Sequence, residues 1–435
     1  MAANEWAPLR LGAVCSKIGS GATPRGGSDV YLQKGPYALI RSQNVYNDGF
    51  HCDGLAFIGE QHAAELENVE VLKGDVLLNI TGDSVARACQ VDSRVLPARV
   101  NQHVTIIRPD PEKLDPRFLR YFLVSPEMQT KLLSWAGSGG TRNALTKGMI
   151  ESFNVVSPTN ISEQCAIAHI LGTLDDKIEL NRRMNETLEA IARAIFKSWF
   201  VDFDPVRAKT EGRDPGLPKH IADFFPDSFE DSKIGEIPKG WGISTVGEEF
   251  NLTMGQSPPG ETYNEIGEGM PFFQGRADFG FRYPNHRVFC TASTRFADPG
   301  DTLVSVRAPV GDINMAAEKC SVGRGVAAIR HKNGSRSYTY YAMRSLVDIF
   351  GNFEAEGTIF GCINKDDFYR IEFKAPPPQL VLYFEKAAFP IDQTIENHII
   401  QSRTLAALRD ALLPKLISGE LRIKDAKRFT GEVMA

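Results

Sequence analysis

Two stretches decide the fold: Lys177-Ile-Glu-Leu-Asn-Arg-Arg-Met-Asn-Glu-Thr-Leu-Glu-Ala-Ile-Ala192 and Thr394-Ile-Glu-Asn-His-Ile-Ile-Gln-Ser-Arg-Thr-Leu-Ala-Ala-Leu-Arg409. When Lys177 is aligned with Thr394, an offset of 217, the stretches carry identical residues at Ile178, Glu179, Thr187, Leu188 and Ala190. Self-similarity at a fixed offset is the signature of a repeated structural unit. The sequence therefore predicts a chain built from two copies of one unit.

Each copy contains a long helix, predicted over residues 157–203 and 378–418. Apolar residues around the first stretch recur at alternating steps of four and three, the period of a coiled-coil seam. We expect the seam to consist of Leu171, Leu174, Ile178, Asn181, Asn185 and Leu188 in the first helix and Ile391, Ile395, His398, Ser402 and Leu405 in the second. Its polar members either only fix the register of the helices or form a partner surface. Pro390 and Pro414 are expected to bound the regular part of the second helix.

A variable region precedes each helix, over residues 1–156 and 238–377. Both regions contain short apolar runs between glycines and turn residues, such as Val76-Leu-Leu78 and Val326-Ala-Ala-Ile329, which predict strands. Asp115-Pro116 predicts the capped start of a short helix. Both variable regions are therefore expected to be α+β. Residues 204–237 are rich in proline and predict an irregular surface linker, and residues 419–435 form a C-terminal tail.

Composition excludes several classes of protein. The 435 residues are 42% hydrophobic with a net charge of −5, so the chain is globular and bulk charge does not hold it on nucleic acid. Its seven cysteines form no C-x-x-C pair, which favours a reducing cytosol. The sequence has neither a signal-peptide pattern nor an apolar run long enough to span a membrane. We expect a cytoplasmic protein without a membrane partner.

Motifs for catalysis are missing from the sequence. There is no phosphate-binding G-x-x-x-x-G-K-[ST] motif, no Gly-x-Gly-x-x-Gly motif and no nucleophile elbow. Asp110 lies too close to Glu112 and Lys113 for the three to gather a metal ion around a scissile phosphate. We therefore expect neither a catalytic residue nor a metal or cofactor in this chain.

The variable regions instead place Arg, Asn, Gln, Ser and Thr next to glycines. Arginine bonds the guanine edge, Asn and Gln bond adenine, and Ser and Thr bond phosphates, so such loops suit DNA recognition. Alone, this enrichment is also typical of solvated surfaces.

The order of the loop strings resembles the target-recognition domains of specificity subunits of type I restriction-modification enzymes. In the first region the strings are Gly19-Ser-Gly-Ala-Thr-Pro24, Ile40-Arg-Ser-Gln-Asn44, Gly74-Asp-Val-Leu-Leu-Asn-Ile-Thr-Gly82, Val100-Asn-Gln-His-Val104 and Gly139-Gly-Thr-Arg-Asn143. In the second they are Gly255-Gln-Ser-Pro-Pro-Gly260, Phe272-Phe-Gln-Gly-Arg276, Val304-Ser-Val-Arg-Ala-Pro-Val-Gly311, Val322-Gly-Arg-Gly325 and Gly357-Thr-Ile-Phe-Gly-Cys-Ile-Asn-Lys365. The resemblance covers nearly the whole chain. One departure is Pro376-Pro-Pro-Gln-Leu380, where the family usually has Pro-Pro-x-x-Glu-Gln.

The resemblance implies two recognition domains held apart by an antiparallel pair of long helices, each domain recognising one half of an asymmetric, bipartite site in double-stranded DNA. A forty-residue helix spans roughly 60 Å, whereas major-groove faces repeat every ~34 Å. The helices would bind two modification subunits, and two motor-nuclease subunits would join them. S-adenosylmethionine, ATP and Mg would act on those partners.

Candidate DNA-binding residues lie in the loop strings. They are Arg25, Arg41, Asn44, Thr81, Asn101, Gln102, Arg142 and Asn143 in the first region, and Gln256, Ser257, Gln274, Arg276, Arg307, Arg324, Thr358, Asn364 and Lys365 in the second. About half are expected to be structural, with Asn101 capping a turn.

Two other classes of function stay open. The chain could be an enzyme whose motifs are unrecognised, which methylation by the isolated chain would reveal. It could also be a coiled-coil scaffold whose globular regions bind protein. A DNA-binding protein differs from such a scaffold because its affinity for DNA falls steeply as salt rises.

Overall fold

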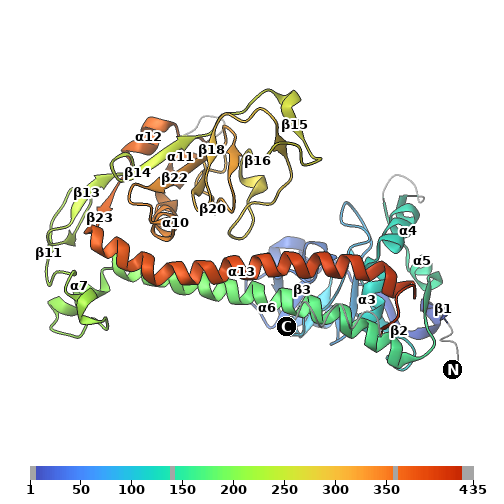
Figure 1. The fold of residues 1–435 in the computed structure, drawn as a ribbon. Helices are drawn as coiled ribbons and strands as arrows, with labels where there is room; N and C mark the ends of the chain where they lie inside the picture. The colour runs from blue at the N-terminus through green and yellow to red at the C-terminus, as the bar shows by residue number, and fades with distance from the viewer. Residues whose placement is uncertain (1–5, 138–142, 356–360, 424–435) are drawn as a thin grey trace. The chain divides into compact units, whose positions relative to one another are not determined.

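The computed structural model describes residues 6–137, 143–355 and 361–423 and divides into two compact units (Figure 1). Unit 1 consists of Met1–Asn181 and Ile400–Ala435, and unit 2 consists of Arg182–Ile399. Each unit contains one variable region and one segment of each long helix. Helices and sheets are mixed in both units, so the predicted α+β class is confirmed.

The two long helices are α6, Ile161–Phe200, and α13, Pro378–Ile417, each of 40 residues. Helix α13 continues through Pro390 and Pro414, so the prediction that these prolines bound its regular part is wrong. A proline removes one backbone hydrogen bond, but most helical stability in proteins comes from tertiary packing. Ala388 and Leu412 are buried beside the two prolines and supply that packing.

Within each unit, the segments of α6 and α13 pack against each other. In unit 1, Leu171 and Leu174 share a core with Leu405, and Asn181 Nδ2 donates to Gln401 Oε1 at 2.9 Å and Ser402 Oγ at 3.2 Å. Asp175, six residues before Asn181, contacts Arg409, seven residues after Ser402, so the segments of unit 1 are antiparallel.

In unit 2, Asn185 Oδ1 lies 2.9 Å from His398 Nδ1, while Ile395 is buried. The polar seam residues of α6 therefore pair with those of α13 inside each unit, which favours a role in fixing register over a role as partner surface. The three remaining members of the predicted seam are only half-buried: Ile178, Leu188 and Ile391.

The variable region of unit 1 consists of three small sheets. A four-stranded sheet has the order β2-β9-β6-β7, with β2 at Cys15–Ser20, β9 at Val104–Pro109, β6 at Val76–Asn79 and β7 at Ala88–Gln90. A second sheet has the order β4-β3-β8-β5, with β4 at Ala56–Ile58, β3 at Tyr37–Ile40, β8 at Ala98–Val100 and β5 at Glu70–Val71. The third pairs β1, Trp6–Arg10, with β10, Asn154–Pro158. The helices of the region are α1, Leu11–Val14, α2, Glu60–Glu65, α3, Pro116–Val124, α4, Pro126–Gly137, and α5, Lys147–Ser152. Asp115 Oδ1 accepts from Phe118 N at 2.7 Å and caps α3 as the sequence predicts.

The variable region of unit 2 repeats this plan. Its four-stranded sheet has the order β14-β22-β19-β20, with β14 at Phe250–Met254, β22 at Val326–His331, β19 at Thr302–Ser305 and β20 at Ile313–Met315. The second sheet has the order β15-β17-β16-β21-β18, with β15 at Tyr263–Asn264, β17 at Phe289–Cys290, β16 at Met270–Phe273, β21 at Cys320–Val322 and β18 at Phe296–Ala297. The third pairs β13, Gly242–Thr245, with β23, Glu372–Ala375. Helices α10, Arg336–Ser345, α11, Val347–Ala355, and α12, Lys365–Arg370, match α3, α4 and α5 in order.

The same contacts of a buried aspartate occur in both four-stranded sheets, where Asp75 precedes β6 and Asp301 precedes β19. Asp75 and Asp301 each accept a hydrogen bond at 2.8 Å from the backbone N–H three residues earlier. Each also binds an arginine of the neighbouring strand: Arg108 Nε lies 2.7 Å from Asp75, and Arg330 Nε lies 2.5 Å from Asp301. The two variable regions therefore share individual side-chain contacts as well as topology.

Residues 204–237 are more regular than predicted. They form α7, Asp204–Thr210, α8, Lys219–Ala222, and β11, Phe229–Glu230, which pairs with β12, Ile237–Pro238. Val206 and Phe225 are buried in the core of unit 2. The prediction of an irregular surface linker is wrong because these apolar side chains give the segment a core to pack against, despite its prolines.

All seven cysteines are free. The described residues contain no group of three or more His, Cys, Asp or Glu side chains that could hold a metal ion. Within the same ranges, no helix is long and apolar enough to cross a membrane.

A partly buried carboxylate joins the variable region of unit 1 to its long helices. Asp175 of α6 accepts hydrogen bonds from Arg120 Nη1 at 2.7 Å and Tyr121 OH at 2.6 Å, both on α3, and from Arg409 Nη1 of α13 at 2.7 Å. Burial raises the pKa of Asp175, but these three partners outweigh burial and hold the pKa below its ordinary value.

We predict that Asp175→Asn lowers the free energy of unfolding by roughly 3 kcal/mol, because it leaves two arginines without their carboxylate. Because the folded-state pKa of Asp175 is lowered, its contribution is fully present above the pKa in the unfolded chain, about 4. That contribution is lost as pH falls through the lower folded pKa. Urea denaturation at a series of pH values measures both effects.

The matched control is Asp176→Asn, since Asp176 is the neighbouring, exposed carboxylate and pairs with Arg117 at the surface. Its cost should stay below about 1 kcal/mol. Equal costs for the two variants would contradict the structural role assigned to Asp175.

Candidate DNA interface

Loops from distant parts of the sequence meet in the variable region of unit 1. Thr23 Oγ1 donates to Gln102 Oε1 at 2.6 Å, and Gln102 Nε2 lies 2.9 Å from His103 Nε2. His103 Nδ1 lies 2.5 Å from Thr81 Oγ1. The backbone N–H of Gly82 donates to the Asn143 carbonyl at 3.3 Å. These hydrogen bonds bring three of the five predicted loop strings to one place and connect a fourth, at Asn143, through the backbone.

Glycines permit this close approach in both units. A Cβ on Gly21 would lie 1.7 Å from the Val100 carbonyl oxygen, and one on Gly255 would lie 2.1 Å from the Gly323 carbonyl oxygen. Any larger residue would push the loops apart. The glycine-rich strings that mark the family-like loops thus have a packing reason in each unit.

The predicted residues of unit 1 fall into three groups. Arg25 and Asn143 are exposed, and Thr81 and Gln102 are partly exposed, so all four side chains can be reached from solvent. Arg41 is half-buried, and its Nη2 donates to the Gly54 carbonyl at 2.6 Å. Arg142 lies outside the described residues.

The remaining two residues, Asn44 and Asn101, are buried. The Asn44 side chain donates to the carbonyls of His51 and Asp53, and its Oδ1 accepts from Arg41 N, so its amide is used inside the protein. Asn101 Oδ1 accepts from His103 N at 3.0 Å, which caps the turn as expected. Both side chains therefore shape the loops, as about half of the candidates were expected to do.

In unit 2, the loops around Gln256, Gln274 and Arg324 converge. Arg324 N donates to Ser257 Oγ at 3.3 Å, and Gln256 N donates to the Val322 carbonyl at 3.0 Å. Gly323 N donates to the Phe273 carbonyl at 2.8 Å, directly before Gln274. Gln256, Gln274 and Arg324 are exposed and Ser257 is partly exposed.

A second group in unit 2 lies around Arg307, which forms a β-bridge with Cys362 and is exposed. Asn364 follows, and its Oδ1 accepts from Asp367 N at 2.9 Å, so this side chain caps α12. Lys365 is exposed, with its Nζ 5.1 Å from the Tyr369 ring centre. Arg276 is exposed and pairs with Asp312 at 3.0 Å. Thr358 lies outside the described residues.

Three exposed arginines have guanidinium groups available for a ligand: Arg25, Arg307 and Arg324. Among the described residues, none forms an ion pair with them. Free, planar guanidinium donors suit phosphate oxygens or the guanine edge. The predicted residues do not include Thr23 and His103, although both lie in quoted strings. Their role, hydrogen bonding between loops, depends on contacts that the sequence does not display.

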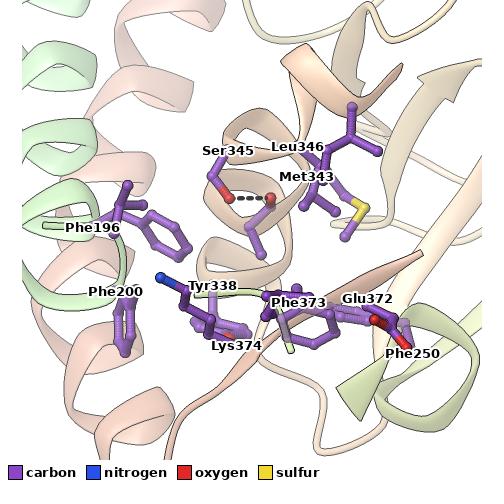
Figure 2. Close-up of a pocket in the computed structure, with 14 residues that line it drawn as sticks. Phe196, Phe200, Phe250, Tyr338, Met343, Ser345, Leu346, Glu372, Phe373 and Lys374 are labelled. Carbon is purple, nitrogen blue, oxygen red and sulfur yellow. Dashed lines mark hydrogen bonds between the residues drawn. The ribbon is translucent and has the colours of Figure 1, made fainter. Parts of the chain in front are cut away.

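The structure also contains an apolar pocket of about 310 Å³ in unit 2 (Figure 2). Phe196 and Phe200 of α6, Tyr338 of α10 and Phe373 of β23 line it, with Lys374 among its few charged residues. Helix α3 has the larger Phe122 at the place of Ala342, which lines the pocket on α10. The pocket is a gap in apolar packing, and its lining brings together no set of catalytic side chains.

Residues 3–190 match the family model described as the type I restriction modification DNA specificity domain. Over nearly its whole length the chain is similar to type I restriction-modification specificity subunits, and these matches support a subunit of that kind. It is 25% identical over 426 residues to the putative type I restriction enzyme MjaX specificity subunit of Methanocaldococcus jannaschii, covering 97% of this chain and 95% of the relative. It is 26% identical over 440 residues to the HindI specificity subunit of Haemophilus influenzae, covering 88% and 94%.

A solved structure shows the same fold. The type I restriction-modification S subunit from M. genitalium aligns with a TM-score of 0.60 at 16% identity, covering 96% of this chain and 97% of that chain.

We predict that Arg307→Ala and Arg324→Ala each weaken binding to the specific DNA site by ~1–3 kcal/mol without changing the melting temperature. Asn44→Ala is the contrasting variant, because losing its buried hydrogen bonds should lower stability by about 1–3 kcal/mol. DNA titrations at fixed salt, with the cognate site and single-base mismatches, measure the binding, and thermal unfolding measures the stability. If both arginine variants fold and bind like the wild type, these loops do not form the DNA surface.

Proposed function

We propose that this specificity subunit recognises an asymmetric, bipartite site in double-stranded DNA, one half-site per variable region. The observation that carries the proposal is one loop framework present twice with different exposed side chains. Unit 1 presents Arg25 on the loop that carries Thr23, whereas unit 2 presents Gln256 and Arg324. Because Gln suits adenine and Arg suits guanine, two different sets of side chains select two different half-sites.

The long helices would hold the partner subunits. Apolar side chains on α6 remain exposed, with Leu180 at 49% in unit 1 and Met184 at 40% and Ile191 at 45% in unit 2. Exposed apolar side chains at helical spacing support a binding surface for another protein. We propose that two modification subunits bind the helices and that two motor-nuclease subunits complete the restriction complex.

In this proposal the chain has no catalytic role. The modification subunits would carry S-adenosylmethionine and methylate adenine, and the motor-nuclease subunits would use ATP and Mg to cleave unmodified DNA. The chain would act in the cytosol, where it meets both DNA and these partners.

The first test concerns activity. The purified chain should transfer no label from S-adenosylmethionine to DNA, and adding its cognate modification subunit should produce site-specific adenine methylation. Methylome sequencing of a host with and without the gene identifies the methylated site. The control is the modification subunit alone, which should not methylate that site. Methylation by the lone chain would instead support the reading of an enzyme with unrecognised motifs.

The second test concerns independence of the two regions. Exchanging residues 1–156 for the equivalent region of another specificity subunit should change one half of the methylated site, because each region has its own sheets and loops. The other half should remain the same. The reciprocal exchange of residues 238–377 is the matched control. An exchange that altered both halves together would contradict independent recognition.

A further inference from the structure

Arg282 is almost completely buried, at 1% exposure, between the variable region of unit 2 and its long helices. Its Nη1 lies 3.0 Å from Asp392 Oδ1 of α13, and its Nη2 lies 2.9 Å from Tyr341 OH of α10. The same Nη2 lies 3.4 Å from Glu189 Oε2 of α6. Burial lowers the pKa of the guanidinium, but Tyr340, Asp392 and the other neighbours outweigh burial and raise the pKa. Arg282 is therefore a charged contact from a loop to both helices.

That loop also carries candidate DNA-binding residues. We call residues 274–287 the readout loop, because it begins with the exposed side chains of Gln274 and Arg276. The buried Asp278 holds its two ends together: its Oδ2 accepts from Gln274 N at 2.8 Å, and its Oδ1 accepts from Arg287 Nη2 at 2.9 Å. The position of Gln274 thus depends on how the whole loop is held.

The middle of the readout loop is fixed to the sheet as well as to the helices. The Arg282 carbonyl accepts from Met315 N at 2.9 Å, and the Gly280 carbonyl accepts from Asn314 Nδ2 at 2.8 Å. Asn285 N donates to the Asp278 carbonyl at 2.8 Å. A continuous path of hydrogen bonds and short chain segments therefore leads from α6 and α13 through Arg282 to the exposed end of the loop.

Unit 1 has the same carboxylate but a different source of arginine. Asp175 aligns with Asp392 at the offset of 217, and Tyr121 bonds Asp175 as Tyr341 bonds Asp392. However, the arginines of unit 1 come from helices α3 and α13. Of these two clusters, the one in unit 2 takes its central arginine from the readout loop.

Stability alone is a weak reason to bury this charge. Among the described residues, Arg282 Nε and Asp392 Oδ2 have no hydrogen-bond partner. Buried ion pairs often contribute no more stability than apolar residues of the same shape, and incompletely satisfied ones contribute less. Such a contact does, however, fix orientation, because each remaining bond requires a particular geometry.

We propose that Arg282 is a positioning residue for DNA recognition by unit 2. It fixes the readout loop relative to α6 and α13, so that Gln274 and Arg276 meet their bases in one orientation. This inference rests on the proposed function. Removing the contact frees the loop, and discrimination among bases is lost in the half-site recognised by residues 238–377.

Two variants test the proposal in the full chain bound to its modification subunits. Tyr341→Phe removes one hydroxyl partner of Arg282. The double variant Arg282→Gln/Asp392→Asn removes both charges together, so neither is left alone, and Glu189 keeps its ion pair with Arg344 at 2.6 Å. The measurement is the ratio of affinities for the cognate site and for sites with one altered base in either half-site.

In the half-site of unit 2, we expect the ratio of affinities to fall about tenfold in the double variant. In Tyr341→Phe the ratio should fall less. Discrimination in the other half-site should not change. Tyr121→Phe is the matched control, because it removes the equivalent hydroxyl in unit 1, and it should preserve the ratio in the half-site of unit 2.

The proposal would be overturned if the double variant kept its affinity ratios, or if the ratios fell equally in both half-sites. A residue that only stabilises the fold would weaken binding to all sites alike. The wild-type complex separates this failure from failure of the proposed function. If it binds the cognate site selectively while the double variant keeps its ratios, only the role of Arg282 is wrong. If the wild-type complex is unselective, DNA recognition itself is wrong and the proposal is overturned with it.

Discussion

A carboxylate on a long helix, partly buried in unit 1 and fully buried in unit 2, is the contact on which each unit depends. Asp175 and Asp392 occupy equivalent places in the duplicated sequence, and each binds a tyrosine hydroxyl from the first helix after the four-stranded sheet. An uncompensated carboxylate in the interior would cost several kcal/mol, so each must have its arginine. This requirement ties the orientation of a variable region to the helices of its unit. A protein that must present loops to DNA at a defined angle needs such a fixed attachment.

Duplication followed by divergence explains which contacts are repeated and which are not. The aspartate–arginine pairs Asp75–Arg108 and Asp301–Arg330 are the same in both units. In both units a glycine also allows one loop to pass close to the backbone of another, at Gly21 and at Gly255. These contacts build the framework, and they tolerate little change because they are buried. The exposed side chains carried by the framework differ between the two units.

The helices combine two kinds of surface. On the inside, Asn181 and Asn185 pair with polar residues of α13, and a polar pair in an otherwise apolar seam penalises any shift of register. On the outside, Met184 and Ile191 leave apolar area exposed. Register matters for a specificity subunit because sliding one helix along the other would move the attached loops relative to DNA.

The sequence by itself determined the duplication, the two long helices, the α+β class and the family, because these follow from periodicity and the order of motifs along the chain. The same strings also supply the candidate DNA-binding residues, such as Gln102 and Arg324, which stay predictions. Only the tertiary structure decided the role of each side chain. Asn44 has a side chain of the kind that contacts bases, but it is buried. Arg282 lies outside every quoted string, but it contacts both long helices. Likewise, Pro390 lies within a continuous helix. The physical reason is that burial, hydrogen-bond partners and packing come from residues far away in the sequence, which local patterns do not encode.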